Sequence, residues 1–345
     1  MSRMTLIVVL LAVVLGGSVL AGVFWAGVRS LDEPLHLLAP VRFKVAPGRS
    51  FAHVAAELAA QGVVEQPRAW VLYARWKGLA SAVKAGEYEI EPGSTPRSLL
   101  AKMVSGQVLL HSFTIIDGWR VAELLAALRR SPDIASTLPT RPTDLMQKIG
   151  APGIDSEGQF LPETYRFPAG TTDVELLHQA HLALNRELDA AWTDRDPNIP
   201  LQNANALLIM ASIVEKETSL PQELGIIAGL YLHRLSMGMR LQADPTVIYG
   251  LGDRYEGELR SVDLRTDTPY NTYTRTGLPP TPIALPSAAA IRAAAHPEKT
   301  DAIFFVASPK GDGSHVFSST LAKQNAAVAQ YVARQRQKSA ASSEK

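Results

Sequence analysis

Two glutamates, Glu215 and Glu217, lie near the end of a predicted helix over residues 202–219 and could transfer protons. Residues two positions apart lie about 200° apart around a helix, so the two carboxylates cannot serve one site together. The positions three, four and seven before Glu217 hold Val214, Ile213 and Met210, whereas those before Glu215 hold Ser212, Ala211 and Leu208. A carboxyl group beside the more apolar stripe is partly desolvated, which raises its pKa toward that of a general acid. We therefore select Glu217; the alternative is a solvated charge cluster with Lys216 at the helix end.

The presence or absence of a second carboxylate nearby determines which reaction such an acid could catalyse. Most glycosidases place two carboxylates about 5 Å apart for retention, or about 6.5 to 9.5 Å apart for inversion. Asp244, in the string QADPT, is the best candidate for that partner. However, an aspartate that precedes a proline in a loop more often forms an Asx turn than it catalyses. Both possibilities stay open for Asp244.

Composition excludes several other kinds of chemistry. The 345 residues contain no cysteine, which excludes disulfides, thiol nucleophiles and cysteine-ligated metal sites. Among the eight histidines, only His178 and His181 are paired at i, i+3, and no carboxylate motif completes a zinc site. No glycine-rich phosphate loop follows a strand, and the net charge of +1 comes without a basic run. We therefore expect no metal, no cofactor and no nucleic-acid partner.

The N-terminal segment accounts for a mean hydropathy of +0.03, which is apolar for a soluble protein of this size. Residues Met4 to Val28 carry no charge, and as a helix they would extend about 37 Å, which crosses a bilayer with some tilt. Trp25 suits the membrane interface. The alternative is a cleaved signal peptide, but the apolar regions of signal peptides span only about 7 to 15 residues. We expect a cytoplasmic tip at residues 1–3, a retained transmembrane helix over 4–28, and the rest of the chain outside the cytoplasm.

A strand, turn and helix pattern occurs three times after a predicted tether over residues 29–41. Each copy has a glycine in its turn, and apolar residues stand six and ten positions after that glycine, which places them on one helix face. The glycines are Gly48, Gly93 and Gly118, and the apolar residues are Val54, Leu58, Leu99, Met103, Leu124 and Leu128.

Residues 42–107 are predicted to form a small unit of their own. A strand over residues 41–45, helices over 51–61 and 67–77, and a strand over 86–90 follow one another in this part of the chain. This βααβ order resembles the LysM module, which binds N-acetylglucosamine-containing chains of peptidoglycan and chitin. A generic α+β adaptor would show the same pattern, because a fold alone does not confer a function.

Residues 108–336 are predicted to form a mixed α+β domain, so the fold class of the chain is α+β. Helices over residues 174–192, 202–219 and 223–237 precede a long proline-rich loop region over 241–286. Strands over 303–307 and 315–318 and a helix over 321–336 follow. Long loops in compact domains are often functional. Residues 337–345 are predicted to be disordered.

Four uncommon strings resemble the endolytic murein transglycosylase (YceG-like) family. In chain order they are EGQFLPETY, ASIVEKET, LYLHRLSMGMRLQADPTVIYG and YNTYTRTGLPPTPIALPS, and their order and spacing are similar to those of the family across nearly the whole chain, with the anchor and the LysM-like unit included. The resemblance implies that Glu217 is the catalytic acid. It implies non-hydrolytic cleavage of MurNAc–GlcNAc linkages within nascent glycan strands, which leaves 1,6-anhydro-MurNAc ends and limits strand length. The location implied is the inner membrane with the bulk of the chain periplasmic, and the partners implied are peptidoglycan glycan strands and penicillin-binding peptidoglycan synthases.

Other polar residues in these strings suit contacts with sugar hydroxyl and N-acetyl groups. The candidate substrate-binding residues are Gln242, Asp244, Thr246, Tyr249, Asn271, Tyr273, Thr276 and Glu163, although each taken alone also fits a structural role. The family has aspartate where this chain has Glu163, which puts that role in doubt. The family also has His-Asn where this chain has Gln324 and Asn325, so no role of that histidine carries over. His315 matches a glycine–histidine segment of the family, and a structural histidine at a strand end is the alternative.

The single carboxyl group of Glu217 suffices for the implied reaction. It would protonate the glycosidic oxygen, and the carboxylate would then take a proton from the C6 hydroxyl of the sugar itself. Two competing hypotheses remain open at this point. One is a peptidoglycan hydrolase that uses Glu217 with Asp244, and the other is a membrane-tethered, wall-binding scaffold without catalysis.

Overall fold

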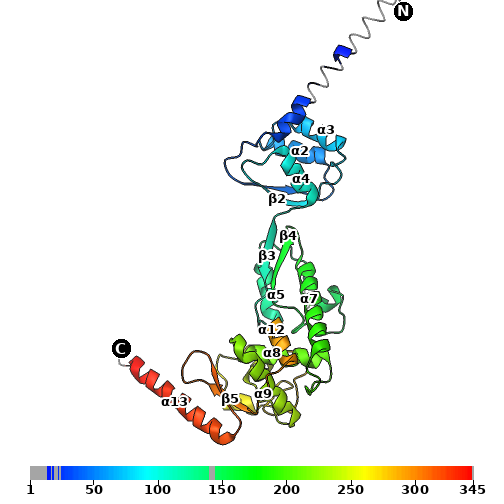
Figure 1. Ribbon diagram of the computed structural model, residues 1–345. Coiled ribbons are helices and arrows are strands. Elements are labelled where there is room, and N and C mark those ends of the chain that lie inside the picture. The colour runs from blue at the N-terminus through cyan, green and yellow to red at the C-terminus, as the bar shows by residue number, and fades with distance from the viewer. Residues whose placement is uncertain (1–13, 17, 19–21, 23–24, 140–143, 344–345) are drawn as a thin grey trace, which may run out of the picture. The chain divides into compact units, whose positions relative to one another are not determined.

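The structure is a computed structural model that describes residues 14–16, 18, 22, 25–139 and 144–343 (Figure 1). The chain divides into two compact units. The N-terminal unit ends at His111 and also includes Arg166–Thr171, and the C-terminal unit comprises Ser112–Tyr165 and the chain from Thr172 onward. Among the described residues, helices mixed with three two-stranded sheets make the fold α+β, as the sequence predicts.

The N-terminal unit contains the predicted order of strand, helix, helix and strand. β1 (Val41–Val45) pairs antiparallel with β2 (Gly86–Ile90), and α2 (Phe51–Ala60) and α3 (Pro67–Trp76) lie between them in the chain. The 3₁₀ helix η1 (Ser30–Asp32) precedes β1, and α4 (Pro96–Ser105) follows β2. Phe51 and Trp70 meet edge to face with ring centroids 4.8 Å apart, and they join α2 to α3 in the core.

The residues predicted to be a tether belong to this unit. Leu31 and Leu35 are buried in its core, and Asp32 accepts a hydrogen bond at 2.5 Å from Nε of Arg97 in α4. The segment lacks a periodic pattern because η1 is a single turn, so the sequence did not reveal that its leucines are buried.

The predicted strand, turn and helix repeat is confirmed. β1 leads into α2, β2 into α4, and β3 (Leu110–Thr114) into α5 (Val121–Arg130). Gly48, Gly93 and Gly118 have φ of 76°, 83° and 71°, where a side chain would be strained. All six apolar residues at the predicted offsets are buried.

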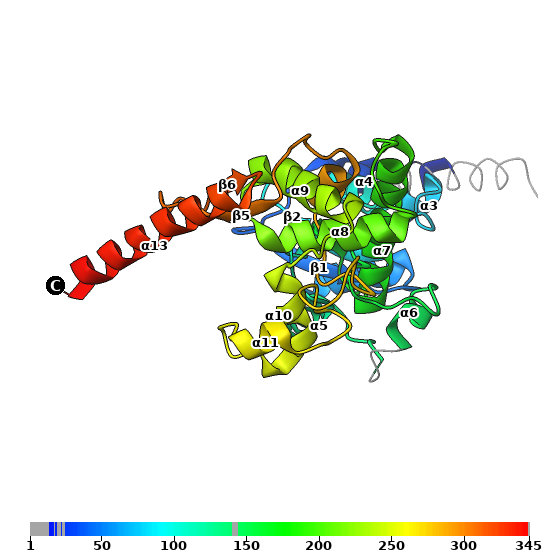
Figure 2. The same cartoon turned by 90° about the horizontal axis from the view of Figure 1, so that it is seen from below.

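Four helices form the centre of the C-terminal unit. α12 (Ala288–Ala295) packs against α7 (Asp173–Asp194), α8 (Ala204–Glu217) and α9 (Leu224–Ser236) (Figure 1), and Figure 2 shows α8 beside α7 and α9. Every residue of α8 from Leu207 to Val214 is buried. This surrounded helix carries the glutamates at its end. Its position is therefore set by packing on several sides.

This unit contains further helices and strands beside these four helices. They are α6 (Leu145–Lys148), η3 (Pro221–Glu223), β5 (Phe304–Ala307), β6 (His315–Ser318) and α13 (Leu321–Ser343), while β4 (Thr164–Pro168) forms a sheet with β3. β5 pairs antiparallel with β6, and α13 packs against both strands.

Two predictions about the C-terminal part differ from the structure. The region 241–286 is not all loop, because it contains α10 (Asp244–Leu251), η4 (Gly252–Arg254) and α11 (Ser261–Arg265). Proline stands in the first turn of α10, where it favours a helix start, although in the sequence it suggested a loop. In addition, α13 continues to Ser343 through the segment predicted to be disordered. Its alanines, glutamines and basic residues are good helix formers.

The predicted transmembrane segment lies largely outside the described residues. Within the part of the chain that is described, no helix has the length and apolar character needed to cross a bilayer.

Candidate active site

Glu217 is the last residue of α8, and its helix face is the apolar one. Met210, Ile213 and Val214, which precede it by seven, four and three positions, are fully buried, while Glu217 itself is half-buried. The helix stops here because Thr218 is extended, with φ of −144° and ψ of 145°. The carboxyl group therefore projects from the edge of the core at a helix end.

The neighbours of Glu217 come from α9 and α10. Tyr231, which is 1% exposed, donates a hydrogen bond from its hydroxyl to Oε1 of Glu217 at 2.5 Å. Burial raises the pKa of Glu217 to about 7, opposed by the hydrogen bond from Tyr231; the charge of Asp244 raises this pKa further and that of Arg234 lowers it. A carboxyl group with such a pKa can give up and take back a proton near neutral pH.

Arg234 is the buried cation of this site. Its Nε donates to the carbonyl oxygen of Ile303 at 2.6 Å, and its Nη1 donates to that of Leu241 at 2.5 Å. Burial lowers the pKa of Arg234, while the acidic groups around it raise it. Because backbone carbonyls hold the guanidinium, Arg234 influences Glu217 through its charge and joins α9 to the segments around β5 and α10.

Glu215 forms hydrogen bonds with the start of α12. Its Oε2 accepts hydrogen bonds from the backbone N–H of Ser287 at 2.9 Å and from the Ser287 hydroxyl at 2.6 Å. Ser287 is the N-cap of α12, so Glu215 ties the end of α8 to the start of α12. Lys216 donates to the carbonyl oxygen of Gly118 at 3.1 Å. The three charged residues thus have three different environments and do not form one solvated cluster.

An open pocket lies beside the end of α8. It measures about 360 Å³ and is lined by Asp117, Gly118 and residues 215–219. Burial raises the pKa of Asp117, which lies in the turn between β3 and α5. The sequence predicted that Asp117 lies in this turn. It did not predict that the turn contacts α8, because that contact joins residues almost one hundred positions apart. The pocket makes Glu217 accessible from solvent.

Asp244 and Tyr273 extend the site. Asp244 is the first residue of α10, not a loop residue, and it is exposed. The Tyr273 hydroxyl donates to its Oδ1 at 2.5 Å. Burial raises the pKa of Tyr273, as does the neighbouring Asp244. Among the predicted site residues, the structure thus brings Glu217, Asp244 and Tyr273 together.

Thr246 and Asn271 support the backbone of this region. Thr246 is fully buried, and its hydroxyl donates to the Ala243 carbonyl at 2.7 Å and pairs with that of Thr272. Asn271, which is 1% exposed, donates to the carbonyl oxygens of Asp263, Leu264 and Thr266 at the end of α11. Both side chains are occupied by backbone groups, and they hold the segments that carry Asp244 and Tyr273.

The hydroxyl group of Tyr249 contacts the carboxyl group of Glu157, which was not among the residues predicted from the sequence. The hydroxyl donates to Oε2 of Glu157 at 3.3 Å, and the backbone N–H of Val121 donates to Oε1 at 3.0 Å. Burial raises the pKa of Glu157 to about 7, opposed by these two hydrogen bonds and by the charge of Arg120. Glu157 is the first residue of the string EGQFLPETY, and its position in that string could have identified it as a candidate site residue.

The remaining predicted residues lie apart from these contacts. Gln242 is exposed with φ of 51°, and Thr276 and Glu163 are exposed. The carbonyl oxygen of Glu163 accepts from Ile115 N–H at 3.0 Å. His315 contacts Glu223 through Nδ1 at 2.7 Å, which fits a structural histidine at the start of β6. No group of acidic and histidine side chains suited to hold a metal ion occurs among the described residues.

Comparisons with known proteins agree with the resemblance in the sequence. The sequence profile of the YceG-like family matches residues 43–330. A protein of Bacillus subtilis named endolytic murein transglycosylase is 29% identical over 341 residues, which cover 93% of each chain. A protein of the same name from Streptococcus pneumoniae is 26% identical over 294 residues, which cover 75% of this chain and 53% of that protein. A crystal structure of a YceG-like protein from Listeria monocytogenes has 25% sequence identity and a TM-score of 0.48, covering 83% of this chain and 98% of that one.

Proposed function

The chain belongs to the YceG-like family, and from this we propose that it is an endolytic murein transglycosylase in which Glu217 transfers the protons. The enzyme class follows from the Bacillus subtilis relative of this name, which matches over 93% of the chain. The observation that carries the role of Glu217 is its pKa of about 7 in a half-buried position that opens into a pocket. The substrate is the glycan strand of peptidoglycan.

The reaction begins with proton transfer from Glu217. Because Oε1 accepts a hydrogen bond from Tyr231, the transferable proton is assigned to Oε2. Oε2 protonates the glycosidic oxygen, the bond from that oxygen to C1 of MurNAc breaks, and GlcNAc leaves with the proton. An oxocarbenium-like centre forms at C1.

The carboxylate of Glu217 then acts as a base. It takes the proton from the C6 hydroxyl of the same MurNAc while the C6 oxygen bonds to C1, which closes the 1,6-anhydro ring and restores the acid. No water is consumed. Tyr231 donates to the carboxyl group in both states, and its hydrogen bond is strongest when the group is charged. One group with a pKa of about 7 therefore serves both half-reactions.

The test is a digest of purified sacculi by the full chain and by Glu217→Gln. The variant keeps the size of the side chain but lacks the transferable proton, and general acid–base catalysis contributes about 10²- to 10⁴-fold to a rate. We expect anhydro-MurNAc ends from the parent and at least about a hundredfold slower release from the variant. Equal rates would refute the role of Glu217. Binding to sacculi without soluble products from either protein would instead support a scaffold.

Hydrolysis with Asp244 is a second candidate, since the charge of Asp244 acts on the Glu217 carboxyl group and raises its pKa. A hydrolase adds water, so its products would be about 18 Da heavier than anhydro ends. Mass spectrometry of the same digest distinguishes the two reactions. Hydrolysis by the parent that disappears in Asp244→Asn would establish this alternative.

We propose further that residues 4–28 anchor the chain in the inner membrane with its bulk in the periplasm, where it limits the length of nascent glycan strands. The charge-free N-terminal segment supports the anchor. Penicillin-binding peptidoglycan synthases, which make the substrate, are the proposed protein partners. The order β1, α2, α3, β2 supports glycan binding by a LysM-like unit. Separation of membranes and co-purification with such synthases test these proposals.

A further inference from the structure

The chain just after the proposed anchor is held against α3. Val28 and Leu31 are 7% and 1% exposed and belong to the core of the N-terminal unit. The backbone of Gly27 passes so close to α3 that an added Cβ would lie 2.9 Å from Cβ of Ala69. The end of the anchor and the first turn of α3 are therefore in direct contact.

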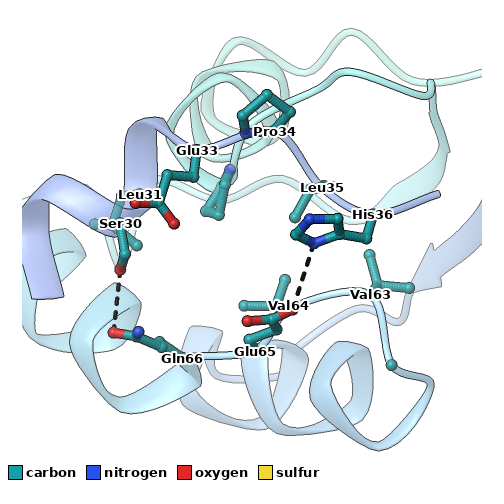
Figure 3. A pocket seen from close by; sticks show the side chains of 12 residues that line it. Ser30, Leu31, Glu33, Pro34, Leu35, His36, Val63, Val64, Glu65 and Gln66 are labelled. Atoms are coloured by element: carbon teal, nitrogen blue, oxygen red, sulfur yellow. Dashed lines mark hydrogen bonds and ion pairs between the residues drawn. The ribbon is translucent and has the colours of Figure 1, made fainter.

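Polar contacts fix the next residues beside the start of α3. The Ser30 hydroxyl donates to Oε1 of Gln66 at 3.1 Å, and Nδ1 of His36 lies 3.4 Å from Oε1 of Glu65. Figure 3 shows both pairs across a pocket of about 50 Å³. Gln66 is the N-cap residue of α3. Because side chains on both sides of this pocket join the two segments, the position of α3 relative to the end of the anchor does not depend on a flexible tether.

The outer side of α3 is apolar and basic. Arg68, Leu72, Arg75 and Trp76 stand at i, i+4, i+7 and i+8, which places them on one side of the helix, and we name them the α3 face. Leu72 is 53% and Trp76 57% exposed, and both arginines are exposed. The opposite side of α3 is buried in the core through Trp70, Tyr73 and Ala74.

The charge of α3 has one sign. The helix contains no Asp or Glu, and Nζ of Lys77, directly after it, lies 4.4 Å from the centroid of the Trp76 ring. Tryptophan is enriched where membranes meet water, and arginine and lysine are attracted to anionic headgroups. The neutral acyl chains suit the side chain of Leu72, and the anionic headgroups suit the basic side chains beside it.

We propose that the α3 face lies in the headgroup layer of an anionic phospholipid bilayer, with Leu72 and Trp76 toward the acyl chains. The proposal rests on the proposed membrane anchor. Because Gly27 contacts Ala69, α3 lies beside the point where the anchor leaves the bilayer. Trp25, which is 62% exposed near the end of the anchor, fits the same interface. The N-terminal unit would then rest on the membrane in one orientation.

The experiment uses the absence of cysteine from the chain. Three variants each carry one cysteine. In the first the cysteine replaces Leu72 of the α3 face, and in the second it replaces Lys44 of β1, an exposed residue of the same unit that serves as the matched control. In the third it replaces Ser18 within the anchor. Each full-length variant carries an environment-sensitive fluorophore and is reconstituted in bilayers of phosphatidylcholine with or without phosphatidylglycerol. Lipids with a quencher in the headgroup or deep in the acyl chain report the depth of each position.

We expect headgroup quenching at position 72 to exceed that at position 44 by roughly twofold or more when phosphatidylglycerol is present. This excess should disappear in a background of Arg68→Gln with Arg75→Gln. Equal quenching at positions 72 and 44, while position 18 responds to the deep quencher, would overturn the proposal and leave the anchor intact. No deep quenching at position 18 would refute the anchor itself. A response of position 72 to sacculi and not to phosphatidylglycerol would also overturn the proposal, in favour of a glycan partner.

Discussion

The hydroxyl group of Tyr231 in α9 donates a hydrogen bond to Oε1 of Glu217 at the end of α8. This bond joins a fully packed tyrosine to the carboxyl group that opens into the pocket. It stabilises the charged form of Glu217 and so opposes the effect of burial on its pKa. The balance between these two effects keeps the pKa close to neutral, and several expectations depend on it.

Replacing Tyr231 by phenylalanine removes this hydrogen bond and raises the pKa of Glu217. A hydrogen bond to a charged group contributes about 1.5 to 3 kcal/mol, which corresponds to roughly one to two pH units. In Tyr231→Phe the alkaline fall of the transglycosylase rate, where Glu217 loses its proton, should therefore move to higher pH. Tyr165→Phe is the control, since its buried hydroxyl donates to the Leu161 carbonyl instead. A pH profile that is the same in both variants would contradict the role of Tyr231.

Stability should depend on pH through Glu217. Its folded-state pKa is raised from 4.5 to about 7, so the folded protein is favoured below pH 4.5 and loses stability as the pH rises to about 7. At about 1.4 kcal/mol per pH unit, this loss amounts to at most about 3.5 kcal/mol. Glu217→Gln should therefore be more stable than the parent at about pH 8 and equally stable at about pH 4. Denaturant unfolding at the two pH values measures the difference, and a variant that is less stable at high pH would contradict it.

Glu157 should be needed for stability at the start of α5. Alanine at this position leaves the Val121 N–H and the Tyr249 hydroxyl without their acceptor, at a cost of about 2 kcal/mol in unfolding free energy. Glu157→Gln keeps an acceptor oxygen and should cost less. Glu163→Ala, an exposed glutamate in the same string, should stay within about 0.5 kcal/mol of the parent. Equal losses from Glu157→Ala and Glu163→Ala would exclude this role.

Two glycines of α9 should respond in opposite ways to alanine. An added Cβ at Gly229 would lie 2.1 Å from the carbonyl oxygen of Glu298, whereas at Gly225 the nearest atom would be 3.6 Å away. Gly229→Ala must displace the backbone beside Tyr231, and we expect at least about 2 kcal/mol of destabilisation and a lower rate. Gly225→Ala should be neutral or stabilising by up to about 1 kcal/mol, because alanine favours the helix. Thermal unfolding and sacculus digestion measure both effects.

The sequence was most informative where a helical period is long and apolar. The residues three, four and seven before Glu217 predicted its buried helix face, and all three are buried in the structure. The same reasoning could not identify Tyr231, because a period shows which side of a helix is buried but not which side chain of another helix covers it. Tyr231 lies on the apolar face of α9 and resembles any core aromatic residue.

Short elements and distant contacts were beyond the sequence. The helix α10 has eight residues, too few for a clear period, and its proline suggested a loop. Glu157 contacts Val121 and Tyr249, which are 36 and 92 positions away. Only the folded chain brings these groups together, and burial then changes the proton affinity of the carboxyl group.

Because α8 ends at Glu217, the orientation of the carboxyl group depends on where the helix begins and how many residues it contains. The carbonyl end of a helix carries a partial negative charge that repels a carboxylate and thereby adds to its affinity for a proton. One residue inserted into α8 would turn its last position by about 100° and carry the side chain away from Tyr231. An insertion or deletion in this helix would thus break the contact between Glu217 and Tyr231 as well as the packing along the helix.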